Sequence, residues 1–223
     1  MVGLIDTRDD LGSESAAIAH PVGSSLKRLV DILLALSGIA LLAPLFVICF
    51  IAIFLTSPGP VLFRHRRIGF NGRSFGCLKF RTMVENADER LQELLDADPL
   101  LAAEWNETQK LQYDPRITAI GEILRKSSLD ELPQIFNVLR GDMSIVGPRP
   151  VTREELTRYS ASVTAYLACR PGITGLWQVS GRSTTTYSKR IACDAFYASN
   201  WSMTLDAKII IVTIPTLLSE GAY

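Results

Sequence analysis

The chain has 223 residues, 48% of them hydrophobic, which is enough for one compact domain with a core and too few for two ordinary domains. Its 23 basic and 23 acidic residues cancel, so the overall charge gives no support for a nucleic-acid-binding protein. No C-x-x-C pair occurs, and we expect reduced thiols without zinc at Cys49, Cys77, Cys169 and Cys193.

The N-terminal quarter of the chain divides into two parts of opposite character. Residues 1–25 are polar and lack periodic apolar positions, so we expect a mobile tail. From Leu29 to Leu55 the only clearly polar side chains are Asp31 and Ser37, and a helix of this length can cross a hydrocarbon core about 30 Å thick. A cleaved signal peptide is excluded, because it would not follow a polar segment of this length. We therefore predict a membrane helix over residues 26–57.

The topology of this helix has two solutions. Lys27 and Arg28 precede it and residues 64–67 add further basic side chains after it, so the positive-inside rule selects no direction. Pro44 lies near the middle and can bend the helix into a re-entrant hairpin, which would keep both basic clusters beside anionic lipids on the cytosolic face. The alternative is a straight span with a tolerated kink. In either case Asp31 is expected to pair with the basic side chains before it.

The remaining residues, 58–223, are expected to form a mainly helical domain with one small β-hairpin that rests on the membrane, an α+β fold. The hairpin is predicted from the extended stretch 61–69, the Asn71-Gly72 turn and a return strand from Phe75 to Phe80. Amphipathic helices at the membrane surface are predicted over 83–96 and 100–111. The apolar run 205–218 is short and broken, which favours an interfacial or core helix.

A polar motif starts another predicted helix at residues 125–134. Ser128 and Glu131 have the spacing of a capping box, in which case Asp130 only complements the helix dipole. However, Pro133 would then lie past the first turn and clash, and a start at Asp130 removes this conflict. In that interpretation the two carboxylates beside Arg125 suit a divalent cation and a phosphate, and a carboxylate can itself accept a phosphoryl group.

Several motifs that occur in order extend this interpretation across the chain. They are KR-x-x-D at residues 27–31, KFRTM at 79–83, SLDELPQ at 128–134, GPRP at 147–150, RPGITGLWQVSGR at 170–182 and NWS-x-x-LD at 200–206. With them the chain resembles the monotopic bacterial sugar transferases, or polyprenyl-phosphate phosphoglycosyl transferases, over roughly residues 27–217. Within this family it is most similar to the undecaprenyl-phosphate galactose phosphotransferases that initiate succinoglycan-type exopolysaccharide.

The resemblance implies a reaction and a set of site residues. The expected reaction transfers a hexose-1-phosphate from a UDP-sugar to undecaprenyl phosphate and releases UMP, at the cytosolic face of the bacterial inner membrane. Asp130 matches the carboxylate that attacks the β-phosphorus and the residue that holds Mg²⁺, and Glu131 matches its partner in the dyad. The basic residues that match the substrate-binding positions are Arg125, Lys79, Arg81, Arg149 and Arg182. The family also favours the re-entrant helix, although this chain has Ala43 where the family commonly has Ser before the proline.

Some alternatives stay open on the sequence. As single residues, Lys79, Arg81 and Arg149 are also compatible with surface ion pairs, and Trp177 and Trp201 with core or interface aromatics. The transferred sugar could be glucose, because C4 epimers differ in the position of one hydroxyl. An anchored transferase with a soluble acceptor and a non-enzymatic scaffold are the competing functions. The sequence does not decide whether the protein is a homo-oligomer, or whether Asp206 belongs to the site.

Overall fold

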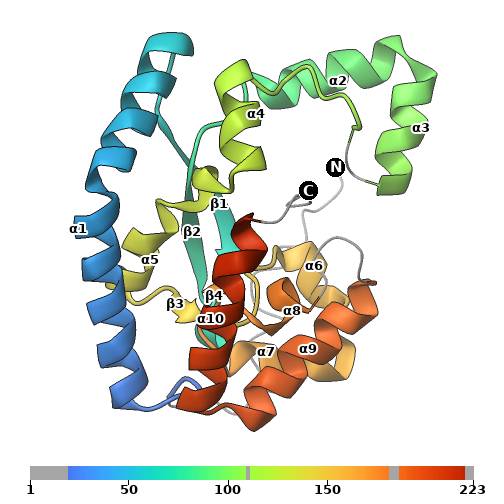
Figure 1. The fold of residues 1–223 in the computed structure, drawn as a ribbon. Coiled ribbons are helices and arrows are strands. Elements are labelled where there is room, and N and C mark those ends of the chain that lie inside the picture. Colours follow the sequence, from blue (N-terminus) through green and yellow to red (C-terminus); the bar gives the residue numbers. More distant parts are fainter. Residues whose placement is uncertain (1–19, 109–110, 181–185, 219–223) are drawn as a thin grey trace, which may run out of the picture.

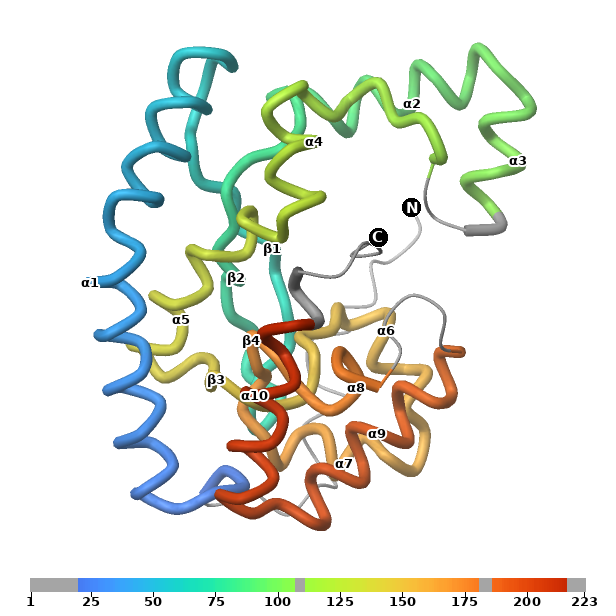
Figure 2. Tube along the Cα trace, viewed as in Figure 1, coloured from blue at the N-terminus to red at the C-terminus, as the bar shows by residue number. Residues whose placement is uncertain are grey.

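The computed structural model describes residues 20–108, 111–180 and 186–218, which are mainly helical with a small antiparallel hairpin, as predicted (Figure 1). The hairpin consists of β1 (Leu62–Ile68) and β2 (Ser74–Phe80). A second, parallel pair of short strands lies beside it (Figure 2) and consists of β3 (Ser144–Val146) and β4 (Gly172–Thr174). The helices are α1 (Ser25–Thr56), α2 (Ala87–Ala97), α3 (Pro99–Thr108), α4 (Ala119–Lys126), α5 (Gln134–Arg140), α6 (Arg153–Thr157), α7 (Val163–Leu167), α8 (Leu176–Val179), α9 (Tyr187–Asn200) and α10 (Met203–Leu218).

Helix α1 is the predicted membrane helix, and by length and composition it is the one helix of the described chain that could cross a membrane. Its start is capped by the side chain of Ser24, which accepts a hydrogen bond from the Lys27 backbone N–H. The helix continues through Pro44 without a break in its helical assignment. Its path through a membrane, re-entrant or straight, stays a prediction.

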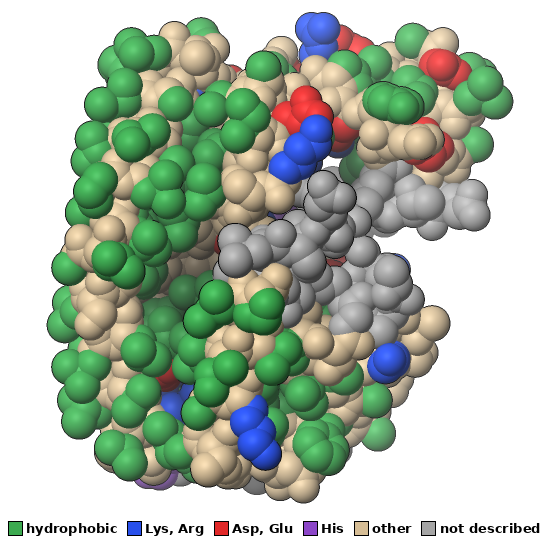
Figure 3. Space-filling view, viewed as in Figure 1, with side chains coloured by type: hydrophobic (Ala, Val, Ile, Leu, Met, Phe, Trp, Pro, Cys, Tyr) green, Lys and Arg blue, Asp and Glu red, His purple; other side chains and the backbone are tan. Residues whose placement is uncertain are grey.

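One narrow stripe of α1 packs against the rest of the protein. Ala35, Cys49 and Ile53 are buried in this stripe, the first against α5 and the other two against β2 and α4. Most of the other side chains are exposed, and Figure 3 shows hydrophobic side chains along the whole length of the helix. Such a large exposed apolar surface is unusual for a helix in water and is expected in lipid.

The hairpin confirms the prediction within one residue at each strand. Arg64 pairs with Leu78 and Phe63 with Lys79 in its antiparallel register. Asn71 and Gly72 both have positive φ values, 55° and 74°, which is the conformation this turn requires and these residue types tolerate.

The two surface helices are shorter than predicted. The first starts at Ala87 rather than at residue 83, because Met83 pairs with Ile117 in a β-bridge. The second starts at Pro99 and ends at Thr108, and Leu111 is not helical. Together α2 and α3 project from the body of the molecule (Figure 1).

The C-terminal half packs around two buried clusters. Tyr159 and Tyr166 form the centre of the first, beneath α6, α7 and α9, with their rings 5.1 Å apart. Ile209 of α10 joins Tyr197 of α9 in the second. The predicted C-terminal helix is confirmed as α10, which buries Ile209 and exposes other apolar residues such as Ile211. The four cysteines are free thiols, as expected.

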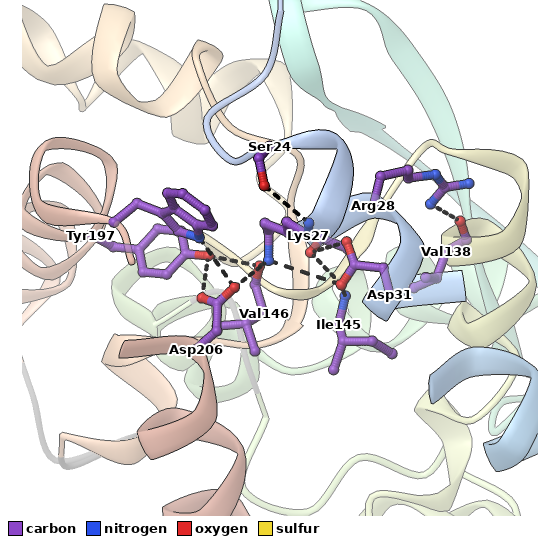
Figure 4. A network of polar contacts seen from close by, with 11 residues as sticks. Ser24, Lys27, Arg28, Asp31, Val138, Ile145, Val146, Tyr197 and Asp206 are labelled. Carbon is purple, nitrogen blue, oxygen red and sulfur yellow. Dashed lines mark hydrogen bonds and ion pairs between the residues drawn. The ribbon is translucent and has the colours of Figure 1, made fainter. Parts of the chain in front are cut away.

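A buried polar network joins the first turns of α1 to α10 (Figure 4). The Lys27 ammonium lies 2.6 Å from Asp206 and 3.9 Å from Asp31, and it donates to the carbonyl of Val146. Arg28 donates to the carbonyls of Val138 and Leu139 at the end of α5. The basic pair before the membrane helix therefore contacts protein groups rather than projecting towards lipid, and the predicted pairing of Lys27 with Asp31 is present.

Candidate active site

The two predicted catalytic carboxylates lie on a tight turn between α4 and α5. Ser128 has a left-handed backbone (φ 57°), a 3₁₀ turn follows over Leu129–Glu131, and α5 starts only at Gln134. The capping box expected at Ser128 is absent, because its side chain makes no cap hydrogen bond. A helix start at Asp130 is also wrong. Pro133 explains the first result, because in a helix capped at Ser128 its ring would clash with the carbonyl of Leu129, and it instead occupies the cap position of α5.

A lysine from the hairpin joins the two carboxylates. The ammonium of Lys79 lies 2.7 Å from Glu131 Oε1 and 3.2 Å from Asp130 Oδ2. Asp130 is 8% exposed, so this group is largely withdrawn from water. The sequence predicted that these three residues belong to one site, and the fold brings them together from β2 and the 3₁₀ turn.

The environment shifts the pKa values of the two carboxyl groups in opposite directions. Burial raises the pKa of Asp130, and the field of Glu131 adds to this, while Lys79 and Arg125 oppose it. For Glu131, burial also acts to raise the pKa, but Lys79 and Arg149 outweigh it and hold the pKa below its usual value. Adjacent carboxyl groups with divergent pKa values are typical of sites where the two groups do different work.

A polar pocket opens beside this group. It is lined by three cationic side chains, Arg67, Lys79 and Arg149, and by one carboxylate, Glu131. The excess of positive charge suits an anionic ligand such as a diphosphate. The other lining residues are Cys77, Gln134, Pro150, Gly172, Ile173 and Gln178. Sequence reasoning missed Arg67, which it treated only as part of a basic cluster beside the membrane.

Arg125 is held next to the dyad by the packing of α4. A Cβ on Gly121 would meet the Thr82 carbonyl at 2.0 Å, so only glycine lets the helix approach this backbone so closely. One turn later the Arg125 Nε donates to Thr82 Oγ1 over 2.9 Å. From this position its charge acts to lower the pKa of Asp130.

Other predicted residues have different surroundings. Arg149 lines the pocket with its guanidinium 5.6 Å from the centre of the Trp177 ring, so the indole packs behind this arginine and does not itself line the pocket. Arg81 instead donates to the carbonyls of Ser57 and Pro58 at the end of α1, away from the pocket lining. Asp206 belongs to the buried network at the base of α1. Arg182 lies outside the described residues.

The two carboxylates beside Lys79, of which Glu131 lines the pocket, are compatible with Mg²⁺. In proteins this ion usually takes one or two carboxylates and completes its shell with water and substrate phosphates. Asp130 and Glu131 supply two adjacent carboxylates, and no group of three or more potential ligands occurs in the described residues. A site of this kind would depend on the substrate for further ligands.

The fold and the pocket together define a class of protein. The chain has a membrane helix and a pair of carboxylates beside several cations, and this combination is typical of an enzyme that acts on phosphate esters at a membrane. The chain belongs to the bacterial sugar transferase family, whose model matches residues 22–220.

Individual relatives are similar over most of this chain. The exopolysaccharide production protein ExoY of Sinorhizobium fredii is 49% identical over 94% of this chain and 93% of its own length. The UDP-galactose-lipid carrier transferase of Erwinia amylovora is 51% identical over 89% of this chain, which spans 42% of that relative. The UDP-glucose:undecaprenyl-phosphate glucose-1-phosphate transferase of Caulobacter vibrioides is 43% identical over 88% of this chain and 72% of its own length.

Proposed function

We propose that this enzyme transfers a hexose-1-phosphate from a UDP-sugar to undecaprenyl phosphate through a covalent aspartyl intermediate, and so initiates exopolysaccharide synthesis. The carboxylate pair bridged by Lys79 in a cationic pocket is the observation that carries the proposal. The names of the relatives support the lipid acceptor and the sugar-1-phosphate product. Galactose is the favoured sugar because of the similarity to the galactose enzymes, with glucose as the alternative.

In the first half-reaction an Asp130 oxygen attacks the β-phosphorus of the UDP-sugar. A new oxygen–phosphorus bond forms, the bond from this phosphorus to the bridging oxygen breaks, and UMP leaves with the electron pair. Burial makes Asp130 a poorly solvated anion, which favours its esterification, because the remaining negative charge of the acyl phosphate then lies on the phosphate oxygens beside the cations of the pocket. Arg67, Arg149 and Lys79 offset the negative charge of the diphosphate during the approach.

In the second half-reaction a phosphate oxygen of the lipid attacks the same phosphorus and releases Asp130. The lowered pKa of Glu131 keeps this carboxylate ionised near neutral pH, where it holds the Lys79 ammonium in the site during both steps. Mg²⁺ bound by Asp130 and Glu131 would supply further compensation of phosphate charge. We expect excess EDTA to abolish turnover, and full activity without any divalent ion would exclude a required metal.

The covalent step can be tested without the acceptor. Lipid-free enzyme mixed with UDP-galactose and Mg²⁺ should release at most about one UMP per active site and gain one hexose phosphate, as ping-pong chemistry requires. Peptide mass analysis should place the adduct on Asp130. An enzyme that is active in the full assay but forms no adduct would exclude the covalent mechanism. If no lipid-extractable product forms, the acceptor is soluble and the lipid assignment is wrong.

The site should face the cytosol of a bacterial inner membrane, where nucleotide sugars are available. Gly23 and Asn71 flank α1 on its two sides, and a re-entrant helix places both on one face. Cysteine at either position should then react with an impermeant reagent from the cytosolic side alone. Labelling of either one from the periplasm would exclude the re-entrant path.

A further inference from the structure

Two glutamine side chains lie in the polar pocket with unused hydrogen-bonding capacity. Gln134 is 3% exposed, and none of the hydrogen bonds found among the described residues involves its side-chain amide. The Oε1 atom of Gln178 is buried and has no hydrogen-bond partner within the part of the chain that the structure describes. A buried amide oxygen without a donor costs free energy, and a ligand that supplies the donor recovers it. The two amides are therefore candidates for ligand contacts.

The cations and the amides suit different parts of the donor substrate. The guanidinium and ammonium groups of Arg67, Lys79 and Arg149 match the charged phosphates. An amide carries no charge but offers both donors and an acceptor, which matches a hydroxyl group, itself a donor and an acceptor. The amides thus complement an uncharged, hydroxyl-bearing part of the ligand.

The position of the amides indicates which part this is. Gln134 begins α5 only three residues after Glu131, and both line the same pocket as Gln178. In a UDP-sugar the hexose is bonded directly to the β-phosphate at which the reaction takes place, whereas the uracil is separated from it by the α-phosphate and the ribose. Groups next to the dyad therefore meet the hexose first.

We infer that Gln134 and Gln178 bind hydroxyl groups of the transferred hexose and so contribute to the choice of sugar. The inference rests on the proposed function, because it takes the UDP-sugar as the ligand. Removal of either amide should weaken use of the whole donor, while binding of UMP, which has no hexose, should stay the same.

The test replaces each glutamine by methionine, which has a similar length and no hydrogen-bonding amide. We expect Gln134→Met and Gln178→Met each to lower kcat/KM for UDP-galactose about tenfold, the equivalent of one hydrogen bond, with an unchanged inhibition constant for UMP. Gln92→Met is the matched control, since Gln92 is exposed on α2 and bonds only Asp96 in its own helix. This control should retain the activity of the unaltered enzyme.

A second measurement does not depend on the folding of a variant. The unaltered enzyme should use UDP-hexoses poorly when a hydroxyl bound by a glutamine is replaced by hydrogen, and the methionine variants should no longer distinguish them. The inference is overturned if the enzyme uses every deoxy analogue as well as the parent, or if the variants match the control or lose UMP inhibition in parallel. If the unaltered enzyme releases no UMP from any UDP-hexose, the proposed function itself fails.

Discussion

Two lysines of this protein lie between two carboxylates, and the two groups are built differently. At the base of α1, Lys27 lies 2.6 Å from Asp206. In the pocket, Lys79 lies 2.7 Å from Glu131. The two ion pairs are almost equally short, so the lysine–carboxylate distance alone does not show which group stabilises the fold and which is available to a substrate.

The surroundings of the carboxylates separate the two groups. Asp206 also accepts hydrogen bonds from the Tyr197 hydroxyl and the Trp201 indole. Asp31, the other carboxylate of the network, accepts from the Ser144 hydroxyl and the Ile145 backbone N–H. These neutral donors satisfy the charges and hold the helices together.

The pocket group lacks such a neutral shell. The side chains of Lys79 and Glu131 are about one-quarter exposed, at 26% and 27%, and they border a cavity with further cations. Uncompensated charge beside open space is available for a ligand. The two groups therefore differ in the completeness of their hydrogen-bonding shells rather than in their ion pairs, and under the proposed function the group with the incomplete shell is the reactive one.

The largest effect should come from the pocket carboxylate. Asp130→Asn keeps the size of the side chain but removes the nucleophilic oxygen, so turnover should fall by about 10³-fold or more, as is typical when a nucleophile is lost. The melting temperature should not change, because the asparagine still fits the turn. Steady-state assays and thermal unfolding in detergent measure the two effects. Substantial activity in this variant would assign Asp130 to structure instead.

The network at the base of α1 should show the opposite pattern. Lys27→Met leaves Asp206 buried without its cation, and the loss of one partner of a buried pair costs about 3–5 kcal/mol of stability. Unfolding in detergent measures this cost. Activity per folded molecule should stay close to that of the unaltered enzyme. A stable but inactive variant would contradict the division between the two groups.

A third carboxylate tests what happens without an ion pair. Asp194 accepts a hydrogen bond from the Tyr159 hydroxyl, and no cation forms an ion pair with it among the described residues. Burial raises its pKa from the usual 3.8 to about 6, although the Tyr159 hydrogen bond and the charge of Arg190 oppose this. Between these two pH values the folded state binds a proton that the unfolded state has released, so stability falls as the pH rises through this window.

The matched variant for this window is Asp194→Asn, which keeps an acceptor for Tyr159 and cannot ionise. Its stability should lack the decline between about pH 4 and about pH 6 that the unaltered protein shows. Unfolding measured over this pH range in detergent provides the test. Identical pH profiles of the two proteins would show that Asp194 is not the responsible group.

The smallest effect is expected where a lysine pair is fully open to water. Lys126 lies 2.6 Å from Glu122, but the two side chains are 69% and 60% exposed. Lys126→Met should cost less than about 1 kcal/mol, because water and salt screen this pair. The same unfolding assay measures it. If Lys126→Met lost as much unfolding free energy as Lys27→Met, burial would not explain the difference between the two ion pairs.

The sequence predicted the elements whose signals are local. The hairpin followed from its turn residues, and the membrane helix from its apolar run. The start of α5 was missed because two local signals compete there, and Pro133 overrides the capping spacing of Ser128 and Glu131. The start of α2 was missed because the bridge of Met83 to Ile117 is a long-range contact.

The site shows the same division. The motifs identified Asp130, Glu131 and Lys79, but Arg67 needed the pairing of the strands. Cross-strand partners of a hairpin share a face, and alternate residues return to it. The register Arg67 with Phe75 therefore places Arg67 on the same face as Lys79, four residues beyond Phe75. The alternation of residues along the two strands therefore indicates that Arg67 lies near Lys79 once the register of the hairpin is known.

The contact of Arg81 with the end of α1 links the apolar helix to the segment that carries Lys79. Its guanidinium binds the carbonyls of Ser57 and Pro58, where the apolar helix finishes, and Lys79 lies two residues away, about 7 Å along the strand. The segment therefore keeps a short, fixed distance between the C-terminal end of α1 and the two carboxylates that Lys79 contacts. Under the proposed function, an acceptor lipid beside this end of α1 would have its phosphate close to Asp130 without leaving the membrane.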